Sequence, residues 1–364
     1  MSKNVKKKCV LHYFCHEHQK PNYINYHGNK KEEFVLKKKI IAIIIGVILI
    51  AGMITIYVLF KPKDETTNLT KINLAEVTHS AFYAPLYVAI EEGYLEEEGI
   101  EVELILTPGA DKVAAAVLSG DVEIGFAGTE SAIYVYDGGE EDYLVTFAGL
   151  TKRDGQFIIG KEKDFDWSSL EGKEVLVGRK GGMPALNFLN ALKNAGIDAS
   201  KVNINYSIDF ASLSGAYIGG TGDFVNLFEP NATLLEKEEY GYVVASIGEL
   251  SGEMPYTAFY ARKSYLNENK ETLIKFNNAI NKGLEFVKNN DARTIAEKIL
   301  PQFPDTSLDD LEKIVQRYKD SDSWLETTYI PEEYFTNLED LMIENDLLEE
   351  YVPYTDLIQN LNNE

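Results

Sequence analysis

The chain has 364 residues, of which 45% are hydrophobic and 26% are charged, and its formal net charge is −23. This composition supplies the core of one large or two small globular domains and is not that of a disordered chain. The acidic balance argues against a nucleic-acid partner, because surfaces that bind nucleic acid are basic.

The N-terminal part separates into a basic tail and an apolar run. Residues 1–39 hold ten Lys and three Glu, a net charge of +7. Residues 40–60 are apolar and uncharged, and as a helix they are long enough to span a bilayer core of roughly 30 Å. By the positive-inside rule we expect a cytoplasmic tail, a transmembrane anchor at 40–60, a linker over 61–69 and the remaining residues outside the cell membrane. The residues after the run lack the small side chains of a cleavage site, so an uncleaved anchor is favoured over a cleaved signal peptide.

Cysteine and histidine are scarce beyond the expected anchor. Cys9 and Cys15 both lie in the tail, and His79 is the only His after residue 60. A lipid anchor would need a Cys just past the apolar run, and none follows it. The tail motif CVLHYFCHEH fits no standard zinc spacing. We therefore expect no lipidation, no disulfide, no metal site and no cofactor.

Strand and helix patterns alternate from residue 72 onward. The segment INLAEVT is strand-like, and the helix that follows has Pro85 near its first position and ends at Gly93. In EVELIL apolar and acidic residues alternate, as in a strand with one exposed face. We predict strands over 72–78, 101–106, 122–128 and 143–150, and helices over 84–92, 111–118 and 130–136.

The same pattern restarts at EVLVG without a long linker. It predicts helices over 211–217 and 230–238 and another from Pro184, between strands over 174–178, 201–207, 222–228, 241–247 and 255–261. From there to the end the sequence is helical, with a capping box at Ser307 and Asp310 and a further helix start at Pro331.

Repeated strand, helix, strand units with short connections indicate mostly parallel sheets covered by helices. We predict an α/β protein of two lobes, each with a mostly parallel sheet, followed by a helical C-terminus. The first lobe covers 70–160 and 256–364, and the second lobe covers 161–255.

Aromatic residues follow the first predicted strand, and ligands of such sheets bind outside the carboxyl ends of the strands. His79, Phe82 and Tyr83 lie at this position, where aromatic rings can stack on a flat ligand. The alternatives are that Phe82 and Tyr83 pack the helix start against the core, and that His79 is an ordinary loop residue.

Small and polar residues begin two of the predicted helices. Thr129, Glu130 and Ser131 start the helix after the third strand, where free backbone amides point outward, although Thr129 could serve as a cap alone. Gly182 and Met183 precede Pro184, so the amides there could bind an anion, or the glycines could serve tight packing.

Charged residues near the predicted cleft point to different ligands. Arg179 and Lys180 favour an anion. Glu229 ends a strand and could accept hydrogen bonds from ligand N–H groups, or it could cap the next helix. Tyr256 and Asp154 lie near the two predicted crossings between the lobes, with Gln156 beside Asp154.

Several motifs of the chain resemble a known family. They are HSAFYAPLYVAIEEGYLEEEGIEVEL at 79–104, LSGDVEIGFAGTES at 118–131, TKRDGQF at 151–157, FVNLFEP at 224–230 and GEMPYTAFYARKSYL at 252–266. They are similar to ABC-transporter solute-binding proteins of the branch that binds nitrate, sulfonates, taurine and the pyrimidine precursors of thiamine. The resemblance implies a type II periplasmic-binding-protein fold that closes on a small ligand and delivers it to a permease and its ATPase. The missing lipidation Cys departs from that family and leaves the mode of attachment open.

The polar residues favour one class of ligand over another. Aromatic rings, Glu130 and Glu229 favour a thiamine-type aminopyrimidine or a related heterocycle, whereas Arg179 and Lys180 favour a sulfonate, taurine or nitrate. A membrane-tethered sensor is a further alternative. An enzyme of the pyrimidine synthase type is the least favoured, because its Cys-rich motif is missing and neither G-x-S-x-G nor H-E-x-x-H occurs. We therefore expect a binding protein with no catalytic residues.

Overall fold

The computed structural model describes residues 38–39, 46 and 69–361. The basic tail, the expected anchor at 40–60 and the linker fall almost entirely outside the described residues, so these predictions are not tested. Among the residues that are described, no helix combines the length and apolar character needed to cross a membrane. The described residues from 69 onward form one compact unit.

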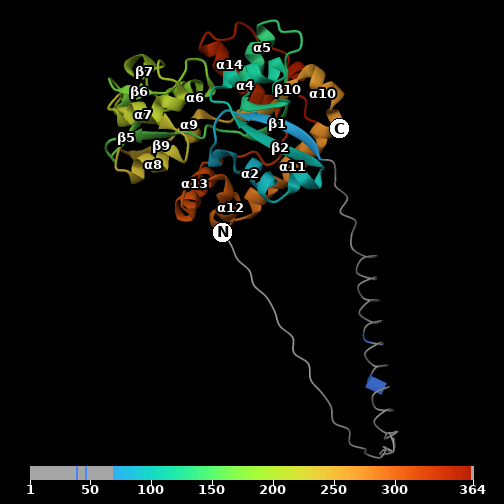
Figure 1. The fold of residues 1–364 in the computed structure, drawn as a ribbon. Coiled ribbons are helices and arrows are strands. Elements are labelled where there is room, and N and C mark those ends of the chain that lie inside the picture. The colour runs from blue at the N-terminus through green and yellow to red at the C-terminus, as the bar shows by residue number, and fades with distance from the viewer. Residues whose placement is uncertain (1–37, 40–45, 47–68, 362–364) are drawn as a thin grey trace, which may run out of the picture. The chain divides into compact units, whose positions relative to one another are not determined.

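The first sheet has the strand order β2-β1-β3-β10-β4 (Figure 1). Strand β10 is antiparallel to both β3 and β4, while β1 is parallel to β2 and β3. From Ile100 to Leu104, edge strand β2 alternates between less exposed apolar positions and exposed acidic positions, as its sequence predicts, and its last two residues are exposed. Strands β3 and β4 are buried along their whole length, because helices or other strands cover them. The strands are β1 Thr70–Glu76, β2 Ile100–Leu106, β3 Ile124–Gly128, β4 Leu144–Thr151 and β10 Thr257–Arg262.

The second sheet has the order β7-β6-β8-β5-β9, with β5 antiparallel to both of its neighbours. Both sheets are therefore mixed, although most strands of each run in one direction. Strand β5 was not predicted, and it lies in the second sheet although residues 157–160 were expected in the first lobe. Its four residues are too short for a periodic signal. The strands are β5 Phe157–Gly160, β6 Glu174–Leu176, β7 Asn203–Asn205, β8 Phe224–Leu227 and β9 Tyr242–Ser246.

Helices surround both sheets, and the C-terminal part is helical as predicted (Figure 1). The Ser307 side chain caps α13 by accepting a hydrogen bond from the Asp310 N–H at 3.2 Å, as the capping motif predicts. The α-helices are α2 Ala84–Glu91, α3 Tyr94–Glu97, α4 Ala110–Ser119, α5 Glu130–Asp137, α6 Met183–Asn194, α7 Leu213–Ile218, α8 Asn231–Lys237, α9 Gly248–Ser251, α10 Lys263–Glu268, α11 Lys270–Asn289, α12 Ala292–Ile299, α13 Leu308–Asp320, α14 Glu332–Glu344 and α15 Tyr354–Leu357. Short 3-10 helices are η1 Ala81–Tyr83, η2 Trp167–Leu170, η3 Ala199–Lys201, η4 Phe210–Ser212 and η5 Leu300–Gln302.

The long amphipathic helix α11 packs closely against α2, which follows the first strand. A Cβ atom at Gly283 would lie 2.1 Å from the Pro85 carbonyl oxygen, so glycine alone permits this approach. This contact holds α2 against α11, and α2 follows directly after the segment that carries His79 and η1.

Candidate ligand cavity

A cavity of about 220 Å³ lies between the two sheets. Its walls come from segments that follow β1, β2 and β3 of the first sheet and β6, β7 and β8 of the second. These are carboxyl ends of strands, the position at which open α/β sheets bind ligands. At about 30 Å³ per water molecule, the volume holds a small molecule and not a polymer.

Helices α4, α5 and α6 begin at this cavity. Their first backbone N–H groups have no partner within the helix and carry the positive end of the helix dipole. Gly128, before α5, allows close packing here. A Cβ atom at Gly128 would lie 2.0 Å from Glu130 Oε2 and 2.5 Å from Met183 Cγ.

Glu130 is the central polar side chain of the cavity, and only 1% of it is exposed. Its Oε1 accepts a hydrogen bond from the Met183 N–H at 3.2 Å and lies 3.7 Å from Arg179 Nη2. Its Oε2 has no hydrogen-bond partner within the described part of the chain. Burial raises the pKa of Glu130 to about 7, although Arg179 and the Met183 N–H act in the opposite direction. The carboxyl group therefore connects the two sides of the cavity and keeps one oxygen available to a ligand.

Two tyrosines contribute hydroxyl groups to the cavity. Tyr83 and Tyr256 are both buried and both line it. The Tyr256 hydroxyl makes no geometrically defined hydrogen bond to any described residue. Burial raises the pKa of Tyr256 well above its usual value, and the neighbouring Asp154 raises it further. Asp154 lies behind the wall, accepts a hydrogen bond from the Gln156 N–H at 2.6 Å and has a pKa raised to about 8 by burial. The cavity thus offers polar groups that can both accept and donate hydrogen bonds.

Charges of both signs line the mouth of the cavity. Arg179 is partly exposed and its Nε lies 3.8 Å from Asp111 Oδ1. Lys112 and Asp209 also line the cavity. The site is therefore not a plain anion pocket, because Asp111, Asp209 and Glu130 line it together with the two cations.

Tyr83, Glu130, Gly182, Met183 and Tyr256 are the predicted binding residues that the structure brings together at the cavity. Other predicted residues lie elsewhere. Phe82 is buried in the core, where its ring centroid is 5.4 Å from that of Tyr83, and it does not line the cavity. Thr129 and Ser131 are also buried behind the wall. The packing alternative therefore describes Phe82.

His79 is held by neighbouring residues and lines a second, adjoining cavity of about 250 Å³. Its Nδ1 lies 2.6 Å from Glu76 Oε1 and its Nε2 lies 2.9 Å from the Gln302 carbonyl oxygen. Burial lowers the pKa of His79, but the hydrogen bond and charge of Glu76 outweigh it, so the pKa is raised. Both ring nitrogens are thus already engaged.

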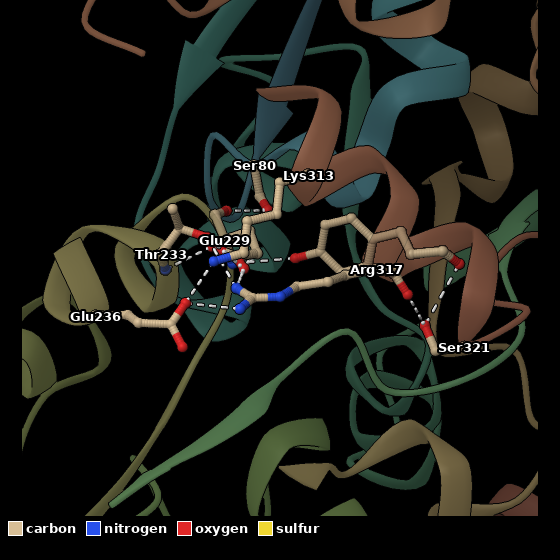
Figure 2. Close-up of polar contacts among 8 residues, drawn as sticks. Ser80, Glu229, Thr233, Glu236, Lys313, Arg317 and Ser321 are labelled. Atoms are coloured by element: carbon tan, nitrogen blue, oxygen red, sulfur yellow. Dashed lines mark hydrogen bonds and ion pairs between the residues drawn. The ribbon is translucent and has the colours of Figure 1, made fainter. Parts of the chain in front are cut away.

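Glu229 does not line the main cavity but lines the second one, and its carboxylate is held by neighbouring residues (Figure 2). The side chain is fully buried, and its Oε1 lies 2.5 Å from Arg317 Nη1. Its Oε2 accepts a hydrogen bond from the Thr233 N–H at 2.8 Å in the first turn of α8. The predicted alternative, that Glu229 caps the next helix, describes this contact, and no part of the sequence pattern indicated Arg317 as its partner.

Further ion pairs join α8 to α13 around Glu229 (Figure 2). Glu236 accepts from Arg317 at 2.9 Å and from Lys313 at 2.6 Å. We refer to Glu229, Glu236, Lys313 and Arg317 as the α8–α13 ion-pair cluster. It connects the second sheet to the C-terminal helices near η1, because the Ser80 hydroxyl also donates to the Glu229 carbonyl oxygen at 2.5 Å.

Sequence reasoning missed part of the cavity wall. Val77, Thr78, Asp209, Phe228 and Thr257 line it without having been chosen as binding residues. Val77, Thr78 and Phe228 directly follow strands, so the rule that ligands bind at the carboxyl ends of strands could have indicated them. Asp209, four residues after β7, and Thr257, the first residue of β10, carried no such signal.

The profile of a family described as NMT1/THI5 like matches residues 81–293. The chain belongs to this family. The binding protein YtlA of Bacillus subtilis (strain 168), whose name gives no ligand, is 40% identical over 317 residues, which cover 86% of this chain and 95% of YtlA. A 4-amino-5-hydroxymethyl-2-methylpyrimidine phosphate synthase of Aspergillus parasiticus is 24% identical over 230 residues, which cover 60% of this chain and 66% of the enzyme.

Solved structures of binding proteins share the fold. The alkanesulfonate-binding protein SsuA from Xanthomonas axonopodis pv. citri, bound to MOPS, has a TM-score of 0.64 at 15% identity and covers 80% of this chain and 98% of its own. The ligand-binding component of an ABC-type import system from Staphylococcus aureus has a TM-score of 0.65 at 16% identity and covers 81% and 98%. The predicted periplasmic-binding-protein fold is confirmed. YtlA and both structures are binding proteins, so the comparisons also support binding over catalysis.

Proposed function

We propose that this protein is the extracytoplasmic solute-binding component of an ABC importer and that it closes on a small heterocycle of the thiamine-type aminopyrimidine class. The observation that carries the proposal is the small cavity between two sheets, in which a buried carboxyl oxygen of Glu130 has no partner among the described residues. Delivery to a permease and its ATPase follows from the resemblance of the sequence to ABC solute-binding proteins. The apolar run at 40–60 would tether the protein to the cell membrane.

The polar groups of the cavity suit a ligand with N–H donors. The Glu130 carboxylate accepts hydrogen bonds, and the Tyr83 and Tyr256 hydroxyls can accept or donate them. Phe228 and Met183 add apolar surface, against which a flat ring can pack. An amino-substituted ring would meet both requirements within the available volume.

The two chain crossings between the sheets support closure as the mode of binding. The first crossing joins β4 to β5 and the second joins β9 to β10 through α9. Rotation about two such segments opens and closes a cleft without disturbing either sheet, and contacts that exist only when the cleft is closed supply the driving energy.

A sulfonate, taurine or nitrate is the second candidate class. Arg179, Lys112 and the N-termini of α4 and α6 line the same cavity, and each favours an anion. The similar structure of SsuA binds alkanesulfonates, which supports this alternative through the fold. The unpaired Glu130 oxygen opposes it, because a carboxylate repels an oxyanion.

A thermal-shift panel on the purified full chain tests the proposal. The panel contains 4-amino-5-hydroxymethyl-2-methylpyrimidine, thiamine, taurine, methanesulfonate and nitrate. A ligand that binds only the native state raises the melting temperature by mass action. Stabilisation by the aminopyrimidine supports the proposal, stabilisation by an oxyanion alone supports the second class, and no stabilisation by any compound contradicts both.

A further inference from the structure

The Glu130 carboxyl group makes contacts that depend on the two sides of the cavity coming together. Residue 130 begins α5 beside the first sheet, whereas Met183, which donates to Oε1, begins α6 beside the second sheet. The other oxygen, Oε2, has no partner within the described residues, and the side chain is 1% exposed. Gly128 leaves the space into which this oxygen fits.

Such an arrangement is unfavourable without a ligand. Moving a carboxylate out of water is costly unless hydrogen bonds replace those that water supplied. The Met183 N–H provides one bond, and Arg179 Nη2 is 3.7 Å from the same oxygen, Oε1. Neither bonds to Oε2. The backbone N–H groups of Glu130 and Ser131 lie near the carboxylate and favour its ionised form, but neither makes a geometrically defined hydrogen bond to Oε2, so the closed arrangement leaves this acceptor without a full hydrogen bond.

We infer that Glu130 is the specificity-determining residue that makes closure conditional on a ligand donating an N–H group to Oε2. This inference rests on the proposed function and deepens it. A donor on the ligand replaces the lost water, and the Met183 N–H then favours the closed arrangement. An oxyanion places a second negative charge beside Glu130 where little water screens the repulsion, and so it opposes closure.

The groups around Glu130 are consistent with this role. Burial raises its pKa to about 7, and an N–H donor favours the ionised form. Binding of a neutral donor therefore releases protons below about pH 7, so affinity strengthens as pH rises toward 7 and levels off above it. Several other titratable or charged groups face Glu130 or its immediate surroundings from the elements packed against α5. They are Tyr83, Asp111, Lys112, Tyr134, Asp154, Arg179, Tyr256 and Tyr260.

The test pairs one protein variant with one change to the ligand. The probes are 4-amino-5-hydroxymethyl-2-methylpyrimidine and its analogue without the 4-amino group, and isothermal titration calorimetry gives their affinities. We expect Glu130→Gln to weaken binding of the amino probe by about tenfold or more, as for loss of a hydrogen bond to a charged group. The wild-type protein should bind the analogue about tenfold less tightly, whereas Glu130→Gln should bind the two probes almost equally. Glu140→Gln, at an exposed carboxylate just after α5, is the matched control and should bind like wild type.

The outcomes separate this inference from the proposed function. Equal loss of affinity for both probes in Glu130→Gln, or no loss, overturns the role of Glu130 while the aminopyrimidine proposal stands. A wild-type protein that binds methanesulfonate or nitrate and neither pyrimidine overturns the ligand class and the inference together. If Glu130→Gln does not fold, Glu130→Asp, which withdraws the carboxylate by one methylene, replaces it in the same comparison.

Discussion

The buried ion pair between Glu229 and Arg317 yields a prediction about stability. The Glu229 side chain is fully buried, and Arg317 is 18% exposed. Arg317→Met keeps much of the side-chain length but removes the hydrogen bonds from the guanidinium to Glu229, Thr233 and Glu236. The Glu229 carboxylate would then retain only the Thr233 N–H and hydroxyl as donors.

Breaking a buried pair by removing one partner costs about 3–5 kcal/mol, because the remaining charge is buried without compensation. With a urea m-value of up to about 3 kcal/mol/M, the unfolding midpoint should fall by about 1 M or more. Replacing Glu229 with Gln as well removes the uncompensated charge, so the double variant should recover much of the lost stability.

Urea unfolding followed by far-UV circular dichroism measures this effect. Arg293→Met is the matched control, because Arg293 is 42% exposed and pairs with Asp309, which is 90% exposed. An exposed pair contributes only about 0–1 kcal/mol. If Arg317→Met and Arg293→Met unfold at the same urea concentration, or if the Glu229→Gln double variant is the least stable, the assignment of Glu229 as a buried structural charge is wrong.

Three further predictions concern packing, the cavity and pH. Gly283→Ala should destabilise the protein by about 1–3 kcal/mol in urea unfolding, because the new Cβ atom would lie 2.1 Å from the α2 backbone. Gly215 has open space around it, so the control Gly215→Ala should not destabilise the protein. Gly128→Ala should lower the affinity for the aminopyrimidine, measured by calorimetry, about tenfold or more, because the new Cβ atom would lie 2.0 Å from Glu130 Oε2. Unchanged affinity would mean that the ligand binds elsewhere. Burial raises the pKa of Asp154 to about 8 in the native state, compared with about 3.9 in the unfolded state. The native state therefore favours protonated Asp154, and this contribution to stability is complete below about pH 4 and is lost as pH rises to about 8. Asp154→Asn should therefore flatten the decline of melting temperature across that range, and an unaltered pH profile would contradict the raised pKa.

Local sequence signals predicted most of the elements. Pro85 lies within the first turn of α2, Gly93 follows its end, and Ser307 caps α13 where the capping motif places it. These signals act within a few residues of each other, so they can be interpreted without the fold. Strand β5 escaped prediction because its four buried residues show no alternation, and the sheet alone assigns them a place.

The candidate site shows the same division. Glu130 begins α5 just after β3, and Glu229 lies between β8 and α8, so from sequence both are candidate ligand-binding carboxylates. Tertiary structure distinguishes the two carboxylates. Arg317, 88 positions beyond Glu229, forms an ion pair with the Glu229 carboxylate, whereas Oε2 of Glu130 has no hydrogen-bond partner among the described residues. The order of strands and helices is therefore determined by neighbouring residues, whereas the choice of the carboxylate that faces the cavity depends on contacts between distant segments.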